Sequence, residues 1–429
     1  MAARWVVALL FLLTAGAYGV TGQVWYLRWA AFWALVGLSN AVLAWLALRG
    51  VTVERHIGQQ RAHVGDVLLE RFVVHNPRPW PLLWVAVEDW GDLPGRRGGR
   101  VLSLIAPHSR RSFLARLRLL RRGLYRLGPV ALTAGDVFGL FSVCRVTPVE
   151  ERLLVYPLVV DLPAFAEPPA GPPGGEALHL RTGQVTPNAV GVREYAPGDP
   201  WKRIHWPSTA RRGRLMVKEF ALDPRSGVWL VVDAREEVQA ALPSAPSPLG
   251  VAAWPWKSEG EGLPLLPNTL EYAASIAASV GRYFLRRGRA VGLWTTDPEA
   301  PALSPDRSPQ QEGRLLERLA LLRPSQGPGL NALRTHPLPH TAYGSLTVIV
   351  TPSVGQEVAT ATEAVRMLGG FPLVVLLDAA SFGGAQGTAA LAARLRRQGV
   401  PVVVIAQGER WAQKLAQPLA WGFVTPVAG

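Results

Sequence analysis

The fold of the C-terminal half is decided by Val228-Trp229-Leu230-Val231-Val232, an uninterrupted apolar run that ends at Asp233. Similar apolar runs follow at residues 290–294, 346–350, 373–377 and 400–405, and stretches of helical length lie between them at residues 270–285, 312–322, 358–368 and 389–397. Strands that are apolar on both faces are typical of a parallel sheet that helices cover on both sides. The sequence beyond residue 223 therefore predicts an α/β domain with a doubly wound parallel sheet.

The passage before this run is the most distinctive one in the chain. Residues 192–220 read VREYAPGDPWKRIHWPSTARRGRLMVKEF, which concentrates charged residues, His and Trp with little amphipathic periodicity. Pro197-Gly198-Asp199-Pro200 predicts a turn with a carboxylate at its apex, and Arg203, His205 and Trp206 follow closely. Such a density of polar and aromatic residues indicates a site, a docking surface or a structural cluster.

This passage resembles the signature of a bacterial family known as domain of unknown function 58, roughly R-E-Y-x-x-G-D-x-x-R-x-I-x-W-x-x-x-A-R followed by L-x-V-K-E-F. The matching positions are Arg193, Glu194, Tyr195, Gly198, Asp199, Arg203, Ile204, Trp206, Ala210, Arg211, Leu215, Lys218, Glu219 and Phe220. Residues 122–125, 136–141 and 155–157 are similar to the family's usual lead-in. The resemblance implies a von Willebrand factor A-like domain. Because some members are encoded beside MoxR-type AAA+ ATPases, it also implies an ATPase partner in place of intrinsic catalysis.

Three roles are open for the passage. Its Arg and Trp side chains are of the types that dominate binding hot spots, which favours docking of a protein partner. Asp199, His205 and Ser208 are the residue types of a hydrolytic constellation. A third interpretation is a buried cluster of ion pairs that fixes the segment onto the next domain, formed by Arg193, Glu194, Asp199, Arg203, Lys218 and Glu219. The interaction residues selected from the passage are Arg193, Glu194, Tyr195, Gly198, Asp199, Arg203, His205, Trp206, Arg211, Lys218 and Glu219.

The resemblance also implies a divalent-cation site, held by Asp-x-Ser-x-Ser after the first strand and by a Thr and an Asp from other loops. Here the strand is followed by Asp233-Ala234-Arg235-Glu236-Glu237, so both Ser positions are charged residues. The guanidinium of Arg235, so close to the end of the strand, would compete with a cation for Asp233. We therefore expect no metal at this position, and no other cofactor in the protein. Glu236 and Glu237 carry the oxygen ligands that hard cations prefer, which keeps a cation site as an alternative.

The middle of the chain has the pattern of β-structure. Phe113, Ala115, Leu117 and Leu119 alternate with polar residues, which is the period of a half-buried strand. Turn residues separate several such runs, and residues 51–145 contain no helix-period stretch, so a small immunoglobulin-like β-sandwich is predicted. The following segment is rich in Pro and Gly and is typical of a linker. We also expect the Pro-rich insert at residues 242–267, with Trp254-Pro255-Trp256, at the ligand-binding edge of the sheet.

The N-terminus predicts a membrane hairpin. Residues 5–26 and 29–48 each form a run without charged residues, close to the ~20 residues that a helix needs to cross a bilayer. Arg4 precedes the first run and Arg49, Arg55, Arg61 and Arg71 follow the second, whereas the connecting segment holds only Arg28, so both termini are expected in the cytoplasm. A signal peptide with Ala15-Gly16-Ala17 as its cleavage site is the alternative for the first run.

The composition adds limits on function. A formal net charge of +14 favours anionic partners, although scattered Arg residues also arise from base composition. The single cysteine, Cys144, excludes an intrachain disulfide and favours a reducing compartment. The predicted segments are a transmembrane hairpin (1–49), a β-sandwich (50–160), a linker (161–190), and the motif with the von Willebrand A-like domain (191–429).

These observations together predict a membrane-anchored adaptor that is not an enzyme. Its partners are the lipid bilayer and a cytoplasmic protein, with a MoxR-type AAA+ ATPase as the candidate that the resemblance implies. A hydrolytic enzyme that uses the Asp199/His205 region is the alternative. Nucleic-acid binding is a remote second alternative, because the Arg residues form no recognisable binding module.

Overall fold

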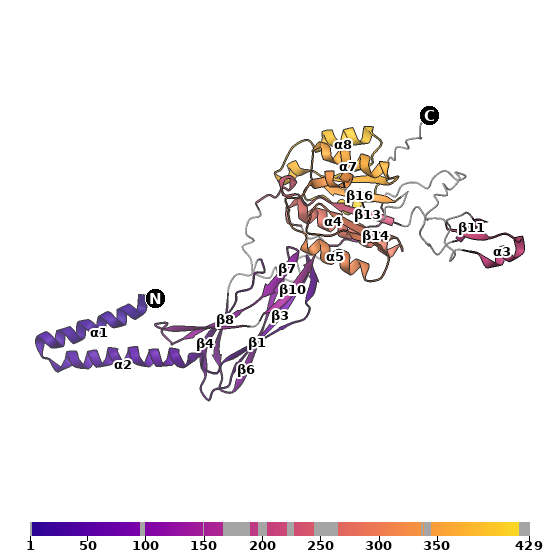
Figure 1. Cartoon of the computed structure of the whole chain (residues 1–429). Coiled ribbons are helices and arrows are strands. Elements are labelled where there is room, and N and C mark those ends of the chain that lie inside the picture. Colours follow the sequence, from indigo (N-terminus) through magenta and orange to yellow (C-terminus); the bar gives the residue numbers. More distant parts are fainter. Residues whose placement is uncertain are drawn as a thin grey trace. The chain divides into compact units, whose positions relative to one another are not determined.

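A computed structural model describes residues 2–94, 99–148, 150–165, 189–195, 204–220, 227–243, 265–335, 338 and 345–419. The chain forms two compact units (Figure 1), the first built on Met1–Tyr156 and the second on Pro157–Pro243 with Pro267–Gly429. Within the described residues the structure is of the mixed α/β class with several separate sheets, as the sequence predicts. Most of the predicted linker and of the insert at 242–267 lies outside the described residues.

The first unit begins with two helices, α1 (Ala2–Thr21) and α2 (Val24–Ala47), that contact each other along their lengths. Gly22 ends α1 with a positive φ of 65°, a conformation that suits glycine, and its N–H donates to the carbonyl of Tyr18 at 2.8 Å. α2 is long and apolar enough to cross a membrane, whereas the apolar part of α1, Trp5–Thr21, is shorter. Length and composition thus support one spanning helix, and the second span of the hairpin stays a prediction.

After α2 come only strands and turns in the described part of residues 52–156. The strands are β1 (Thr52–Ile57), β2 (Arg61–His63), β3 (Val67–Asn76), β4 (Leu82–Asp89), β5 (Arg100–Ile105), β6 (Ser109–Arg118), β7 (Gly123–Leu127), β8 (Val130–Gly135), β9 (Ser142–Thr147) and β10 (Glu151–Tyr156). They form sheets of order β1-β3-β6, β5-β4-β8-β9 and β2-β10-β7.

The core of this β-region lies between the first two sheets and continues into the end of α2. Phe72 and Val74 of β3 pack with Val85 of β4 and Leu132 of β8, and Ala47 belongs to the same cluster. Burial alternates along β3, which is the pattern that the sequence shows for a half-buried strand. Because the last turn of α2 belongs to this core, helix and β-region form one packed body. The immunoglobulin-like relationship stays a prediction.

The second unit is centred on a six-stranded sheet of order β15-β14-β13-β16-β17-β18. Its strands are β13 (Gly227–Val232), β14 (Ala290–Thr295), β15 (Leu303–Asp306), β16 (Leu346–Thr351), β17 (Phe371–Leu377) and β18 (Val402–Ile405). All neighbours are parallel except the edge strand β15, which is antiparallel to β14. The neighbours of β13 on its two sides are β14 and β16, so the direction of winding reverses at β13.

Helices cover both faces of this sheet (Figure 1). They are α4 (Thr269–Arg286), α5 (Gln311–Leu321), α6 (Ala332–Thr335), α7 (Gln356–Met367), α8 (Thr388–Arg397) and α9 (Trp411–Leu415). Trp229 and Val231 of β13 pack with residues of α6, α7 and α8, whereas Leu230 lies next to Gly281 of α4 on the other face. This burial on both faces explains why the strands are apolar without alternation.

Two further features of the second unit differ from the predicted segments. Phe165, placed by the sequence in the linker, is buried, and its ring lies 5.2 Å from that of Phe284 on α4. The motif passage contains the antiparallel pair β11 (Ala189–Glu194) and β12 (Met216–Phe220), with the short helix α3 (Trp206–Arg212) between them. Burial of its ring accounts for the position of Phe165 in the Pro- and Gly-rich segment. Strand pairing accounts for regular structure in the motif passage, although its sequence has little amphipathic periodicity.

Candidate functional site

The first candidate site lies at the carboxyl edge of the sheet, where β13 ends in Asp233. Open α/β sheets bind ligands at this edge, at the strand where the winding reverses. The backbone N–H of Asp233 donates to the carbonyl of Val350 at 3.0 Å, which continues the pairing of β13 with β16. This bond fixes the carboxyl group of Asp233 at the junction of the two strands, where it is fully buried.

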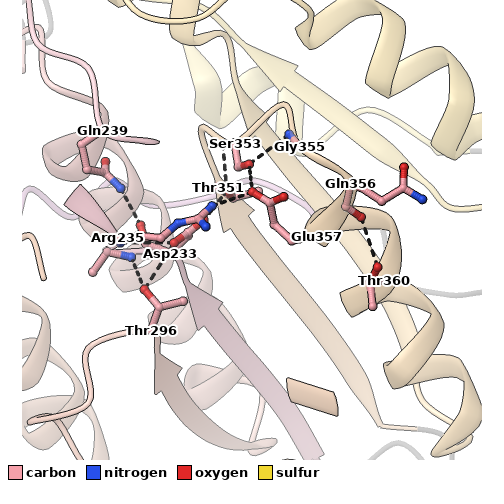
Figure 2. A network of polar contacts seen from close by, with 11 residues as sticks. Asp233, Arg235, Gln239, Thr296, Thr351, Ser353, Gly355, Gln356, Glu357 and Thr360 are labelled. Carbon is pink, nitrogen blue, oxygen red and sulfur yellow. Dashed lines mark hydrogen bonds and ion pairs between the residues drawn. The ribbon is translucent and has the colours of Figure 1, made fainter. Parts of the chain in front are cut away.

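The carboxyl group of Asp233 accepts hydrogen bonds on both oxygens (Figure 2). Thr351, at the end of β16, donates its hydroxyl to Oδ2 at 2.8 Å. Oδ1 accepts the hydroxyl of Thr296 at 3.3 Å and the backbone N–H of Arg235 at 3.2 Å. Gln239 donates from its side chain to the backbone carbonyl of Asp233 at 2.8 Å. The strand ends β13, β14 and β16 are thus joined through one carboxyl group.

An ion pair lies beside this group. Nη2 of Arg235 is 2.5 Å from Oε1 of Glu357, at the start of α7, and both side chains are more than four-fifths buried. The same oxygen accepts the hydroxyl of Ser353 at 2.5 Å, and Ser353 in turn accepts the N–H of Gly355 at 3.1 Å. Figure 2 shows Arg235 lying between Asp233 and Glu357. A fixed positive charge therefore separates the carboxyl groups of Asp233 and Glu357.

The environment shifts the pKa values of the two carboxyl groups in opposite directions. Burial raises the pKa of Asp233, because desolvation disfavours the charged form, and the hydrogen bonds from Thr351 and Arg235 offset this only in part. Burial alone would also raise the pKa of Glu357. Hydrogen bonds from Ser353, its own backbone N–H and Arg235 outweigh that effect, so the pKa of Glu357 is lowered. Of these two groups, Glu357 is therefore the stronger acid, and its carboxylate is paired with Arg235.

These residues do not suit the divalent cation that the von Willebrand A-like resemblance implies. A cation at Asp233 would need an ionised carboxylate, yet burial favours its neutral form. It would also lie close to the guanidinium of Arg235, which holds Glu357. Glu236 and Glu237 are exposed on a short 3₁₀ turn. Within the described residues no group of three His, Cys, Asp or Glu side chains has the arrangement of a metal site.

The second candidate site is the motif passage, of which the structure describes part. Gly198, Asp199 and Arg203 lie outside the described residues. Arg193 is paired in register with Val217, and Lys218 and Glu219 lie on β12 opposite Val192 and Gly191. The two strands of the pair thus carry the first and the last residues of the motif side by side.

The described side chains of the motif lie mostly at the surface. Glu194 pairs with Arg214 at 2.7 Å, and both are well exposed, so this ion pair is not part of a buried cluster. Trp206 is 64% exposed and Arg211 is exposed, whereas Tyr195 is half-buried. No residue of α3 is buried, although the helix carries Trp206.

One pair of the proposed hydrolytic set is brought together. Nδ1 of His205 lies 2.7 Å from Oγ of Ser208, within hydrogen-bond distance. The two residues are three positions apart at the start of α3, with His205 at the cap position. Residues at this spacing are neighbours on a helix, so local geometry alone brings the two side chains together.

Sequence reasoning selected Asp233 but missed its partners. Thr296 and Thr351 end the two strands beside β13, and a hydroxyl residue directly after a buried apolar run was the available signal. Glu357 gives no such signal, since it is one of several acidic residues at the starts of helices. Only the folded chain brings it to Arg235.

Comparison with solved structures finds low similarity. The CARDB domain of the PF1109 protein from Pyrococcus furiosus is 14% identical, with a TM-score of 0.19, over 24% of this chain and 91% of that one. Red sea bream transglutaminase is 14% identical, with a TM-score of 0.18, over 24% of this chain and 14% of that one. Scores at this level assign neither a fold nor a function to the chain.

Comparison of sequences is more informative. The chain is 28% identical over 243 residues to the uncharacterized protein YeaD of Bacillus subtilis (strain 168), which is 53% of this chain and 60% of that protein. The match therefore spans less than two thirds of the relative. A family model described as protein of unknown function DUF58 matches residues 191–241, the stretch that holds the motif, β13 and Asp233. These two matches support the resemblance of the chain to the DUF58 family.

Proposed function

We propose that this protein is a membrane-anchored adaptor, not an enzyme, which presents its α/β unit to a protein partner in the cytoplasm. α1 and α2 form the anchor as a hairpin with both ends in the cytoplasm. The α/β unit has the von Willebrand A-like fold. The resemblance to the DUF58 family makes a MoxR-type AAA+ ATPase the first partner to test.

The surface of the anchor supports this proposal. The side chains of Leu35 and Leu38 on α2 are each 65% exposed, and those of Trp25 and Trp29 near its start are 67% and 53% exposed. A helix of 24 residues with this surface needs an apolar surrounding. Arg4 and Arg49 lie at the outer ends of the hairpin, which favours a cytoplasmic location for both.

The observation that carries the binding role is α3, which has no buried residue and yet holds a 64% exposed Trp. A seven-residue helix gains little stability from its own backbone hydrogen bonds. Trp206 and Arg211 are also of the residue types that dominate binding energy at interfaces. We therefore assign the partner contact to α3, within the passage that the family model matches.

The carboxyl edge of the sheet supports a role without catalysis. The carboxyl groups of Asp233 and Glu357 there are engaged by threonine hydroxyls or by Arg235. A general base needs a lone pair that a substrate proton can reach. Buried hydroxyls and a paired charge at this edge instead favour a structural role, in which they hold the ends of β13 and β16 and the start of α7 together.

A binding experiment with the full chain tests the proposal. The tagged chain, solubilised in mild detergent, is immobilised and titrated with the MoxR-type ATPase encoded in the same genome. We expect saturable binding that Trp206→Ala weakens at least tenfold and Arg211→Ala weakens several-fold. Trp90→Ala, which removes a 54% exposed Trp from the first unit, should leave the affinity unchanged. Equal affinity of the Trp206→Ala and Trp90→Ala chains would refute the role of α3.

A hydrolytic function is the second candidate, and the short distance between His205 and Ser208 favours it. It predicts that a fluorophosphonate reagent labels Ser208. We expect no labelling of the intact chain, since the contact has the geometry of a helix start. Labelling that disappears in both Ser208→Ala and His205→Ala would contradict the adaptor proposal and indicate a hydrolase.

A further inference from the structure

A pocket of about 340 Å³ lies where α2 meets the β-region. Leu43 and Leu46 of α2 line it on one side, and Trp80 and Leu83 line it on the other. Most of the wall is therefore apolar. The polar exception is Arg78, which lies in the turn between β3 and β4 and is only 7% exposed.

Arg78 uses only part of its hydrogen-bonding capacity within the protein. Nη1 donates to the carbonyl of Leu46 in the last turn of α2, where helix carbonyls lack helical partners. Nε donates to Oδ1 of Asn76 at 3.0 Å. Nη2 is buried and has no hydrogen-bond partner among the described residues. A buried guanidinium N–H without a partner is costly unless a ligand accepts its hydrogen bond.

The charge of Arg78 has no carboxylate partner among the described residues, although its Cζ lies 5.7 Å from the centroid of the Trp80 ring. The described ion pairs include no carboxylate at Arg78. Burial lowers the pKa of Arg78, because desolvation disfavours its charged form. An anionic group in the pocket, which Arg78 lines, would offset this effect. Arg suits phosphate oxygens in particular, because its planar N–H groups can bind two of them.

The position of the pocket along α2 indicates that the anion is the phosphate of a membrane lipid. A helix of 24 residues is ~36 Å long at ~1.5 Å per residue, compared with ~30 Å of hydrocarbon in a bilayer. The last turn of a spanning α2 therefore lies at the level of the lipid headgroups. Trp45 and Trp80, exposed by 57% and 44%, suit that level. Arg49 lies over the ring of Trp45, with its Cζ 3.3 Å from the ring centroid.

The loop between β8 and β9 adds a second apolar contact at the same place. α2 contacts both strands, and Gly135, at the end of β8, lines the pocket. Next to it Val137 and Phe138 are 62% and 72% exposed. Asp136 is fully buried and accepts hydrogen bonds from the N–H groups of Phe138, Leu140 and Phe141, which keeps the loop in a fixed shape. Exposed apolar side chains on a fixed loop are suited to insertion at a membrane interface.

We infer that this pocket binds one glycerophospholipid, with the phosphate at Arg78 and an acyl chain along Leu43, Leu46 and Leu83. The inference rests on the membrane anchoring that we propose above. The bound lipid would join the end of α2 to the β-region and so set the β-region against the membrane surface.

Lipid binding to the full chain in mild detergent tests this inference by native mass spectrometry. Dioleoyl phosphatidylglycerol is compared with dioleoylglycerol, which has no phosphate, and with inorganic phosphate. We expect one phosphatidylglycerol to bind saturably and the two other compounds to bind at least tenfold more weakly. Equal binding of dioleoylglycerol would overturn the role of Arg78, and equal binding of inorganic phosphate would overturn the role of the apolar wall.

Three variants locate the site. Leu83→Trp fills the pocket but keeps the two side-chain hydrogen bonds of Arg78, and we expect it to weaken phosphatidylglycerol binding at least tenfold. Arg78→Gln should weaken it as strongly. Arg116→Gln, which removes an exposed charge from β6, should have no effect. Unchanged binding in Leu83→Trp overturns the pocket even if the Arg78 variant folds poorly.

Extraction of membranes with alkaline carbonate separates this inference from the proposed anchor. Retention of the wild-type chain and of Leu83→Trp in the membrane pellet, with lipid binding lost only in the variant, supports the pocket. Retention of the wild-type chain without saturable phosphatidylglycerol binding overturns the pocket alone. Release of the wild-type chain by carbonate overturns the anchor and the lipid site together.

Discussion

The ion pair between Arg235 and Glu357 joins the end of β13 to the start of α7, and both side chains are more than four-fifths buried. Glu357→Gln leaves the guanidinium without its counter-charge, which for a largely buried pair costs about 1–3 kcal/mol. We expect hydrogen exchange of the β13 and β16 amides to become about 5- to 150-fold faster at pH 7. Glu363→Gln, the same change at an exposed position of α7, should leave these rates within about twofold.

The effect of Glu357→Gln should also depend on pH. The pKa of Glu357 is lowered in the folded chain, so the folded state binds fewer protons than the unfolded one between the two pKa values. Its stabilising contribution is complete above the unfolded pKa of about 4.5 and is lost as the pH falls through the folded pKa. The difference between wild type and variant should therefore shrink in acid. A difference that is the same at pH 7 and pH 3.5 would contradict the assignment of the pKa shift.

The contribution of Asp233 to the free energy of unfolding should change with pH in the opposite direction. Because burial raises its pKa, the folded state keeps the proton to a higher pH than the unfolded state. The free energy of unfolding then falls as the pH rises from the unfolded pKa of about 3.8 to the folded pKa, and the penalty persists above it. Asp233→Asn removes this titration. We expect the stability of the Asp233→Asn chain relative to wild type to rise over this pH range, measured by the same amide exchange at matched pH.

Asp233→Ala separates the titration from the hydrogen bonds. This change leaves the hydroxyls of Thr296 and Thr351 without a side-chain acceptor, so we expect Asp233→Ala to be less stable than Asp233→Asn by about 1–3 kcal/mol, with little dependence of this difference on pH. A parallel pH profile for wild type and both variants would show that Asp233 has the same pKa in both states.

At the scale of the elements, the contact of β14 with β13 depends on Gly292. A Cβ atom there would lie 2.9 Å from ring carbons of Trp229 and 2.9 Å from the carbonyl oxygen of Leu303. Gly292→Ala should therefore destabilise the sheet by about 1–3 kcal/mol, because neither a buried ring nor a backbone carbonyl can move freely. Gly227→Ala is the matched control, since its Cβ would meet only Ser345 at 4.0 Å. Equal thermal stability of the two variants in detergent would contradict this packing.

The elements also show what the sequence can and cannot predict. β13 and β17 are apolar throughout, and β16 nearly so, because both faces are buried, so their positions follow from the sequence alone. β15 was missed because Leu303–Asp306 is a short edge strand that contains Pro305. Asp233 was found at the end of an apolar run. The pairing of Arg235 with Glu357, 122 residues further along the chain, depends on which strands are neighbours, and a single sequence does not carry that information.

At the scale of the whole molecule, the direction of the anchor decides which compartment the partner occupies. The single cysteine is a natural probe of this, because Cys144 is exposed on β9 in the first unit. If both ends of the hairpin lie in the cytoplasm, a membrane-impermeant maleimide should leave Cys144 unlabelled in intact cells. It should label Cys144 after the membrane is opened with detergent. The Cys144→Ser chain should stay unlabelled in both cases.

A second position gives the reciprocal result. Gln23 lies exposed between α1 and α2, so Gln23→Cys in the Cys144→Ser background should be labelled from outside in intact cells. These two positions test the span by α2 but not the hairpin, because a single span by α2 would also place them on opposite sides. The two arrangements differ in residue 1, which a single span would put outside. An epitope tag before Met1 that resists external protease in intact cells would place residue 1 in the cytoplasm, as two spans require. Labelling of Cys144 in intact cells would move the α/β unit outside the cell and remove the cytoplasmic ATPase as a partner.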